Sequence, residues 1–181
     1  MLSCCKTALD QGRFTWRHDN ILKYIVDCID TTKYKVHSDI DGYETANGGT
    51  IPINMTVTNL KPDIVIIDEK KKTVNIVELT VPFEHNIKVR NIYKTNKYAH
   101  FLSDISSHTP TLTAFEVGCR GYLTKENTDR LKSIHKYCDK NITQKRFLEN
   151  ISALAITGSY YIFIARKQPT WSPPGFLTPP L

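Results

Sequence analysis

The sequence predicts an α/β domain, that is, a mixed β-sheet with helices on both of its faces. Short runs rich in branched apolar residues at 64–67 and 74–81 are typical of strands, and a polar turn separates them. Longer segments on either side, at 15–29 and 84–102, repeat their apolar residues at helical spacing. The resulting order of helix, strand, hairpin, helix, strand and helices implies a mixed sheet.

The first half of the chain is expected to supply a helix and three strands. We predict a helix over residues 15–29, because Thr15 can act as N-cap and His18, Leu22 and Ile25 fall on one stripe. The other elements expected here are a strand at 33–40, a loop at 41–50, and a hairpin of strands 64–67 and 74–81 around the turn 69–72.

The second half is expected to add helices and one more strand. Pro82 ends the hairpin, and residues 84–102 have helical periodicity without glycine or proline. A strand at 112–117 and helices at 125–138 and 144–166 follow. The proline-rich segment 167–181 has no periodicity and is predicted to be a disordered tail, which leaves one folded domain at 13–166.

Composition favours a nucleic-acid partner and a reducing compartment. The 181 residues carry a formal net charge of +6, and the basic residues are spread through foldable segments, which suits a polyanion. The five cysteines are an odd number without the spacing of a disulfide framework. No apolar run approaches the roughly 20 residues that span a bilayer, so we expect an intracellular protein without a membrane partner.

The predicted hairpin brings two carboxylates together. If Asp68 pairs with Thr73, counting back along both strands places Asp63 opposite Glu78 on one otherwise apolar face. Two like charges at that spacing disfavour folding unless a cation neutralises them, and Mg²⁺ prefers such oxygen ligands. The alternative is a hairpin whose strand ends simply carry solvated acids. A register shift of one residue would send one carboxylate to the other face.

Several separated motifs resemble a known nuclease family. Pro62-Asp63 on one strand and Glu78-Leu79-Thr80 on the next resemble the PD-(D/E)XK nuclease motif. Together with 12–19 (GRFTWRHD), 80–84 (TVPFE) and 94–98 (KTNKY), they are similar to the restriction-like endonuclease at the C-terminal end of certain non-LTR retrotransposon polyproteins. The resemblance covers roughly residues 2–166.

This resemblance implies a restriction-endonuclease-like core with a mixed central sheet of about four strands flanked by helices. It implies a nuclear enzyme that nicks target DNA by phosphodiester hydrolysis and so creates the 3′ end that primes reverse transcription. By resemblance, Asp63 and Glu78 bind Mg²⁺ or Mn²⁺ and act in catalysis. The expected partners are DNA, the RNA of the element and the rest of the polyprotein.

The sequence departs from the family motif at Thr80, where the motif has a lysine. Relatives of this type carry a lysine displaced onto the following helix. On the predicted helix 84–102, Lys94 falls on the stripe that faces the sheet, which makes it the first choice for the catalytic lysine. Lys97, at the edge of that stripe, and Lys61, expected opposite Thr80, remain alternatives. Lys94 could instead extend from a buried stem without any catalytic role.

Other basic and acidic residues are candidates for binding. By resemblance to the nuclease superfamily, Asp19 on the first helix is a candidate outer metal ligand, although such a residue more often only solvates a helix start. Phosphate contacts, which would add affinity without sequence specificity, are expected from Arg13, Arg17, Arg90 and Lys97.

Residues 1–12 resemble the end of a truncated zinc knuckle, to which Cys4 and Cys5 would belong. No partner stands at ligand spacing, so zinc is not expected in this chain. Two alternatives to the endonuclease stay open. One is a catalytically inactive DNA-binding remnant of such an element, and the other is a nuclease like a junction resolvase.

Overall fold

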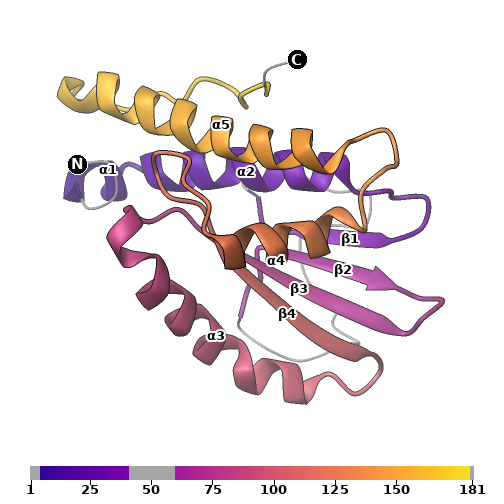
Figure 1. Ribbon diagram of the computed structural model, residues 1–181. Coiled ribbons are helices and arrows are strands. Elements are labelled where there is room, and N and C mark those ends of the chain that lie inside the picture. The colour runs from indigo at the N-terminus through magenta and orange to yellow at the C-terminus, as the bar shows by residue number, and fades with distance from the viewer. Residues whose placement is uncertain (1–4, 41–59, 180–181) are drawn as a thin grey trace.

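A mixed four-stranded sheet forms the centre of the computed structural model, which describes residues 5–40 and 60–179. The strands lie side by side in the order β1-β2-β3-β4 (Figure 1). The β1–β2 and β2–β3 pairs are antiparallel, and β3 runs parallel to β4. The strand bounds are β1 (Lys35–Ser38), β2 (Ile64–Asp68), β3 (Thr73–Thr80) and β4 (Thr109–Glu116).

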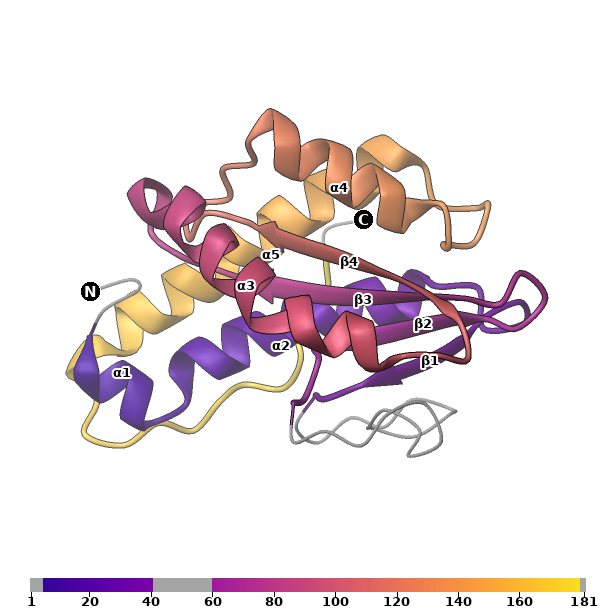
Figure 2. The same cartoon turned by 90° about the horizontal axis from the view of Figure 1, so that it is seen from below.

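Helices cover both faces of this sheet. Figure 2 shows α3 across one face, with α2 and α5 on the other side of the sheet. The predicted α/β class with helices on both faces is therefore confirmed. The helices are α1 (Lys6–Asp10), α2 (Arg13–Cys28), η1 (Glu84–Asn86), α3 (Ile87–Asp104), α4 (Lys125–His135), α5 (Gln144–Ile164) and η2 (Ala165–Lys167).

Each face of the sheet has its own apolar core, because alternate side chains of β2 and β3 point to opposite sides. The larger core joins strand residues such as Ile66 and Val77 to α2, α4 and α5, for example through Phe147. The smaller core joins four strand residues to Tyr98 and Phe101 of α3. Those four are Val65, Ile67, Val74 and Ile76.

The first predicted helix starts earlier than expected. It begins at Arg13, and the residue at its N-cap is Gly12 with a φ of 69°, so Thr15 lies inside the helix. A positive φ suits glycine, which has no Cβ to clash with the backbone. The predicted strand at 33–40 is shorter, at Lys35–Ser38. The loop expected at 41–50 lies outside the described residues.

Residues 168–179 lack helices and strands but pack along α2, where the sequence suggested a disordered tail. The side-chain nitrogen Nε1 of Trp16 donates a hydrogen bond to the carbonyl of Pro174 at 2.9 Å, and the amide of Leu177 donates to Oδ1 of Asn20. Trp171 also packs against Trp16 and Leu177 against the larger core, and these side chains supply contacts that the proline content of the segment did not suggest.

The segment Gln144–Lys167, which spans α5 and η2, is long and apolar enough to cross a membrane by length and composition alone. However, Phe147, Ile151, Leu154 and Ala155 of this helix are buried in the larger core. Its apolar character is thus accounted for in part by packing against the rest of the fold.

Candidate functional site

The hairpin of β2 and β3 has the predicted register. Asp68 pairs with Thr73, and Ile67 with Val74. The turn is held by Oδ1 of Asp68, which accepts hydrogen bonds from the backbone amides of Lys70 and Lys71. This local arrangement fixes which side chains share a face, because one slipped residue would exchange the two faces.

Asp63 and Glu78 meet at the end of this hairpin through reciprocal hydrogen bonds. The backbone amide of Asp63 donates to Oε1 of Glu78 at 3.0 Å. In return, the backbone amide of Leu79 donates to Oδ2 of Asp63 at 2.7 Å. Each carboxylate is therefore held by the backbone of the opposite segment, which orders both side chains before any ligand arrives.

Lys94 of α3 reaches both carboxylates. Its Nζ lies 2.5 Å from Oε2 of Glu78 and 3.9 Å from Oδ2 of Asp63. The helix presents Lys94 to the sheet because Ile87, Tyr98 and Phe101, on the same stripe, are buried. Of the three candidate lysines, Lys94 is the one that the structure brings to the carboxylate pair.

His18 of α2 links Asp63 to Asp19. Its Nε2 lies 3.2 Å from Oδ2 of Asp63 and 3.3 Å from the carbonyl oxygen of Leu79, and its Nδ1 lies 3.0 Å from Oδ1 of Asp19. Asp19 is therefore linked to the carboxylate pair indirectly, through the imidazole ring of His18. The sequence pattern placed His18 only on an apolar stripe and gave no sign that it would bridge two acids.

The charges at the site shift the pKa values of its members. Burial by itself lowers the pKa of His18, but the Asp63 charge and the hydrogen bonds to Asp19 and Asp63 outweigh it and raise that pKa to about 10. The pKa of Asp63 is lowered, because the charges and hydrogen bonds of its neighbours, His18 first, exceed the effect of burial. Burial and the Asp63 charge raise the pKa of Glu78 despite the nearby Lys94.

The donor atoms at the site suit a hard divalent cation. Asp63 and Glu78 supply carboxylate oxygens, and the carbonyl oxygen of Leu79 lies 3.3 Å from His18 Nε2, the same atom that is 3.2 Å from Asp63 Oδ2. In the described part of the chain, no group of three or more His, Cys, Asp or Glu side chains could hold a metal ion. Mg²⁺ is commonly bound by one or two carboxylates and keeps several waters, so two carboxylates and a carbonyl fit it.

A second buried acid, which was not among the residues predicted from the sequence, lies on the same side of the sheet. Glu116 pairs in register with Thr80, two residues beyond the pair Glu78–Ala114 and on the same face of the sheet. Its carboxylate accepts hydrogen bonds from Nδ2 of Asn91 at 3.1 and 3.3 Å, and Arg130 lies 3.7 Å away. Burial raises its pKa in spite of these neighbours. A lone glutamate in an apolar strand was the signal that could have identified it.

The other two candidate lysines lie at the edge of the site. Nζ of Lys97 is 4.9 Å from the ring centroid of Tyr98, and its side chain is exposed. Lys61 is also exposed, and its carbonyl accepts a hydrogen bond from Oη of Tyr98 at 3.1 Å. Arg90 is exposed on α3, so the prediction that it contacts phosphate is not tested by the structure.

The structure does not support phosphate contacts by Arg13 and Arg17, because each is only 1% exposed. Nη1 of Arg13 donates to the carbonyl of Ala165 at the end of α5, where helix carbonyls lack partners. Arg17 donates to Oγ of Ser159 and to the carbonyl of Val81. Both guanidinium groups hold segments of the fold together instead of facing solvent.

Comparison with known proteins gives no assignment, since no protein-family model matches the chain and no curated protein matches it by sequence.

Proposed function

We propose that this protein is a metal-dependent DNA endonuclease of the PD-(D/E)XK type that nicks DNA by phosphodiester hydrolysis, as in the integration of a non-LTR retrotransposon. The observation that supports it is the meeting of two carboxylates and a lysine from three segments. Asp63 precedes β2, Glu78 lies on β3 and Lys94 on α3, and Nζ of Lys94 is within 3.9 Å of both acids.

Asp63, Glu78 and the Leu79 carbonyl would hold Mg²⁺ or Mn²⁺, the cation that such oxygen donors favour. When bound, this ion supplies Lewis-acid stabilisation of the phosphate and lowers the pKa of water. The reciprocal hydrogen bonds to the amides of Asp63 and Leu79 keep both carboxylates oriented. His18, held by Asp19, restricts Asp63 further.

Lys94 is the cationic side chain proposed to act on the reacting phosphate. The Lys94 side chain is 20% exposed, so most of it is shielded from solvent. This side chain is long enough to turn from Glu78 to a phosphate oxygen. There the ammonium group stabilises the negative charge that develops during displacement. Burial lowers the pKa of Lys94, but Asp63 and Glu78 more than offset this and raise it, so the group stays charged at neutral pH.

Plasmid nicking tests this proposal. Supercoiled plasmid is incubated with Mg²⁺ and the wild-type protein, Asp63→Asn or Glu78→Gln, and nicked circles are measured on a gel. We expect each substitution to reduce the nicking rate at least about 100-fold. Glu69→Gln is the matched control, because Glu69 is an exposed acid at the turn end of the same hairpin.

A melting experiment separates metal binding from activity. Mg²⁺ should raise the melting temperature of the wild-type protein and of Glu69→Gln, but not of Asp63→Asn, because a ligand stabilises only a fold that binds it. Nicking that survives Asp63→Asn would overturn the proposed mechanism. A wild-type protein that binds DNA and never nicks it would instead be an inactive DNA-binding remnant.

A further inference from the structure

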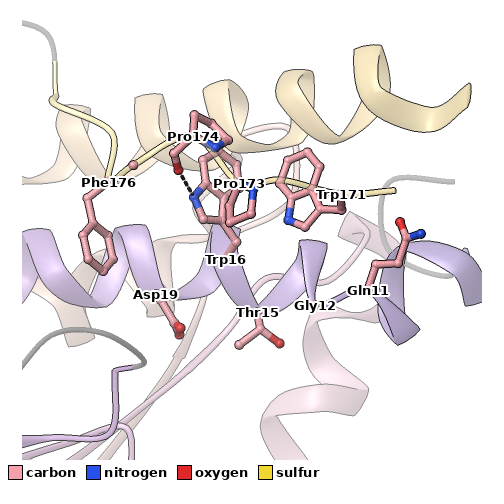
Figure 3. A pocket seen from close by; sticks show the side chains of 10 residues that line it. Gln11, Gly12, Thr15, Trp16, Asp19, Trp171, Pro173, Pro174 and Phe176 are labelled. Atoms are coloured by element: carbon pink, nitrogen blue, oxygen red, sulfur yellow. Dashed lines mark hydrogen bonds between the residues drawn. The ribbon is translucent and has the colours of Figure 1, made fainter. Parts of the chain in front are cut away.

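A cavity of about 460 Å³ lies between the first turns of α2 and the C-terminal segment. Figure 3 shows the rings of Trp16, Trp171 and Phe176 near the C-terminal segment, whereas Asp19 and Thr15, which also line the cavity, project from the flank of α2 that faces away from this segment. Its volume lies in the range of small-molecule sites, about 300 to 1,000 Å³, and its lining is mainly aromatic and apolar with a few polar groups.

The walls of this cavity are held in place by contacts between α2 and the C-terminal segment. Trp16 packs edge to face against Trp171 at a centroid distance of 5.5 Å, and its indole nitrogen is bonded to Pro174. The guanidinium carbon of Arg13 lies 5.2 Å from the Trp171 ring. Nε2 of Gln11 donates to the carbonyl of Pro169 at 2.9 Å. The aromatic surface therefore exists before a ligand binds.

The cavity is linked to the carboxylate site by a chain of hydrogen-bonded side chains. Asp19 lines the cavity, and its Oδ1 is 3.0 Å from His18 Nδ1. The other nitrogen of the same ring lies 3.2 Å from Asp63 Oδ2. Only one imidazole ring and two hydrogen-bond distances separate Asp19 from the carboxylate that would hold the metal ion beside the scissile phosphate.

We propose that this cavity binds a nucleobase of the DNA strand, unstacked from its neighbours beside the scissile phosphate. The proposal rests on the proposed nuclease function, which places a DNA backbone at Asp63. A nucleobase is flat and aromatic on its faces, so it can stack on indole and phenyl rings, and its edges carry polar groups. Trp171 and Phe176 would supply the stacking surfaces.

The polar residues of the cavity suit the edge of a base. The carboxylate of Asp19 can only accept hydrogen bonds when ionised, and the exocyclic amino groups of cytosine, adenine and guanine donate them. The hydroxyl of Thr15 can donate and accept, whereas the side chain of Gln11 is already bonded to Arg13 and to the Pro169 carbonyl. We therefore expect cytosine to bind better than thymine, a base of similar size without an amino group.

Intrinsic fluorescence reports on this cavity directly. The chain contains two tryptophans, Trp16 and Trp171, and both line it. Binding is measured with single-stranded oligodeoxycytidylate and with an abasic oligonucleotide of the same length, with Ca²⁺ in place of Mg²⁺. The abasic strand keeps the phosphates and hence the electrostatic attraction. We expect oligodeoxycytidylate to quench the tryptophan fluorescence and to bind about 5- to 100-fold more tightly than the abasic strand.

Two substitutions test whether the base binds in this cavity. Phe176→Ala should reduce the difference between the two strands at least about 5-fold while leaving the affinity for the abasic strand unchanged. Phe163→Ala is the matched control, because Phe163 is 43% exposed and Phe176 37%, and Phe163 lines a different cavity beside Cys119. Both variants keep the two tryptophan reporters. Asp19→Asn should remove a preference for oligodeoxycytidylate over oligothymidylate.

Equal quenching and equal affinity for the two strands in the wild-type protein would overturn the base site. If the same protein still nicks plasmid, the proposed function stands and only this inference fails. Base-dependent quenching in a protein that never nicks DNA would support the base site and refute the nuclease. A protein that binds neither strand and does not nick plasmid refutes both.

Discussion

Nζ of Lys94 lies 2.5 Å from Oε2 of Glu78, and this contact joins α3 to β3 at the end of the hairpin. The lysine side chain is 20% exposed and the glutamate side chain is fully buried. Removing either partner would leave a buried charge without its counter-charge, which is costly in a low-dielectric environment. The Lys94–Glu78 pair therefore has two roles: it positions the proposed catalytic lysine, and it stabilises the contact between α3 and the sheet.

Substitution of the candidate lysines should single out Lys94. We expect Lys94→Ala to reduce plasmid nicking at least about 100-fold, because it removes the ammonium group beside both carboxylates. Lys97→Ala should change the nicking rate less than about 5-fold, since the Lys97 ammonium lies against Tyr98 and, under the proposed function, would contribute mainly to DNA affinity. Loss of nicking with Lys97→Ala but not Lys94→Ala would reassign the lysine.

Buried and exposed arginines should behave differently when substituted. We expect Arg17→Ala to lower the free energy of unfolding by about 2 to 4 kcal/mol, because Ser159 and the Val81 carbonyl lose a buried donor. The Arg17 side chain packs against Gly158. A Cβ at position 158 would lie 2.7 Å from Cγ of Arg17, so glycine leaves the space that the arginine occupies. Urea denaturation measures the change.

Arg90→Ala is the comparison, because Arg90 is exposed on α3. It should leave the unfolding free energy within about 0.5 kcal/mol of wild type. DNA binding should nevertheless weaken, and the dependence of affinity on salt should become shallower. Equal destabilisation by Arg17→Ala and Arg90→Ala would contradict the assignment of a structural role to Arg17.

Glu116 should matter for both stability and nicking. Glu116→Ala removes one acceptor of Asn91, whose Nδ2 also donates to the Ala114 carbonyl, and the counter-charge of Arg130, so we expect a loss of about 1 to 3 kcal/mol in unfolding free energy. Asn91 lies one turn before Lys94 on α3, so nicking should fall as well. Glu116→Gln keeps an acceptor for Asn91 and should be milder in both assays. A Glu116→Ala protein as stable as wild type would show that the contacts of Glu116 with Asn91 and Arg130 contribute nothing to stability.

The buried thiol of Cys28 should make the fold less stable at high pH. Burial raises the pKa of Cys28 to about 11, whereas an unfolded thiol ionises near about 8.5. Stability from keeping this thiol protonated is fully present below about pH 8.5 and is lost as the pH rises towards the folded pKa, because the unfolded chain releases its proton first. The free energy of unfolding of the wild type should thus fall between about pH 8 and pH 10.

Cys28→Ala provides the control for this pH dependence. It removes the titrating thiol, so urea denaturation should show a smaller fall over the same pH interval. The same fall in both proteins would mean that another group, such as the nearby Cys138 with its pKa raised to about 12, accounts for the pH dependence.

The sequence by itself determined the features that depend on short-range geometry. Turn length and the two-residue period of a strand were sufficient to predict the pairing of Ile67 with Val74 and to place Asp63 near Glu78. Helical periodicity was sufficient to place Lys94 on the face of α3 that meets the sheet. These patterns need no knowledge of distant segments.

Only the tertiary structure decided which distant segments satisfy one another. Arg13 resembles a surface residue by composition, yet it is buried because the carbonyl of Ala165, at the far end of the chain, accepts its hydrogen bond. The bridge from His18 to Asp63 and the packing of Trp171 on Trp16 likewise join residues far apart in the sequence. Local propensity contains no information about such pairings, because they depend on how whole elements pack against each other.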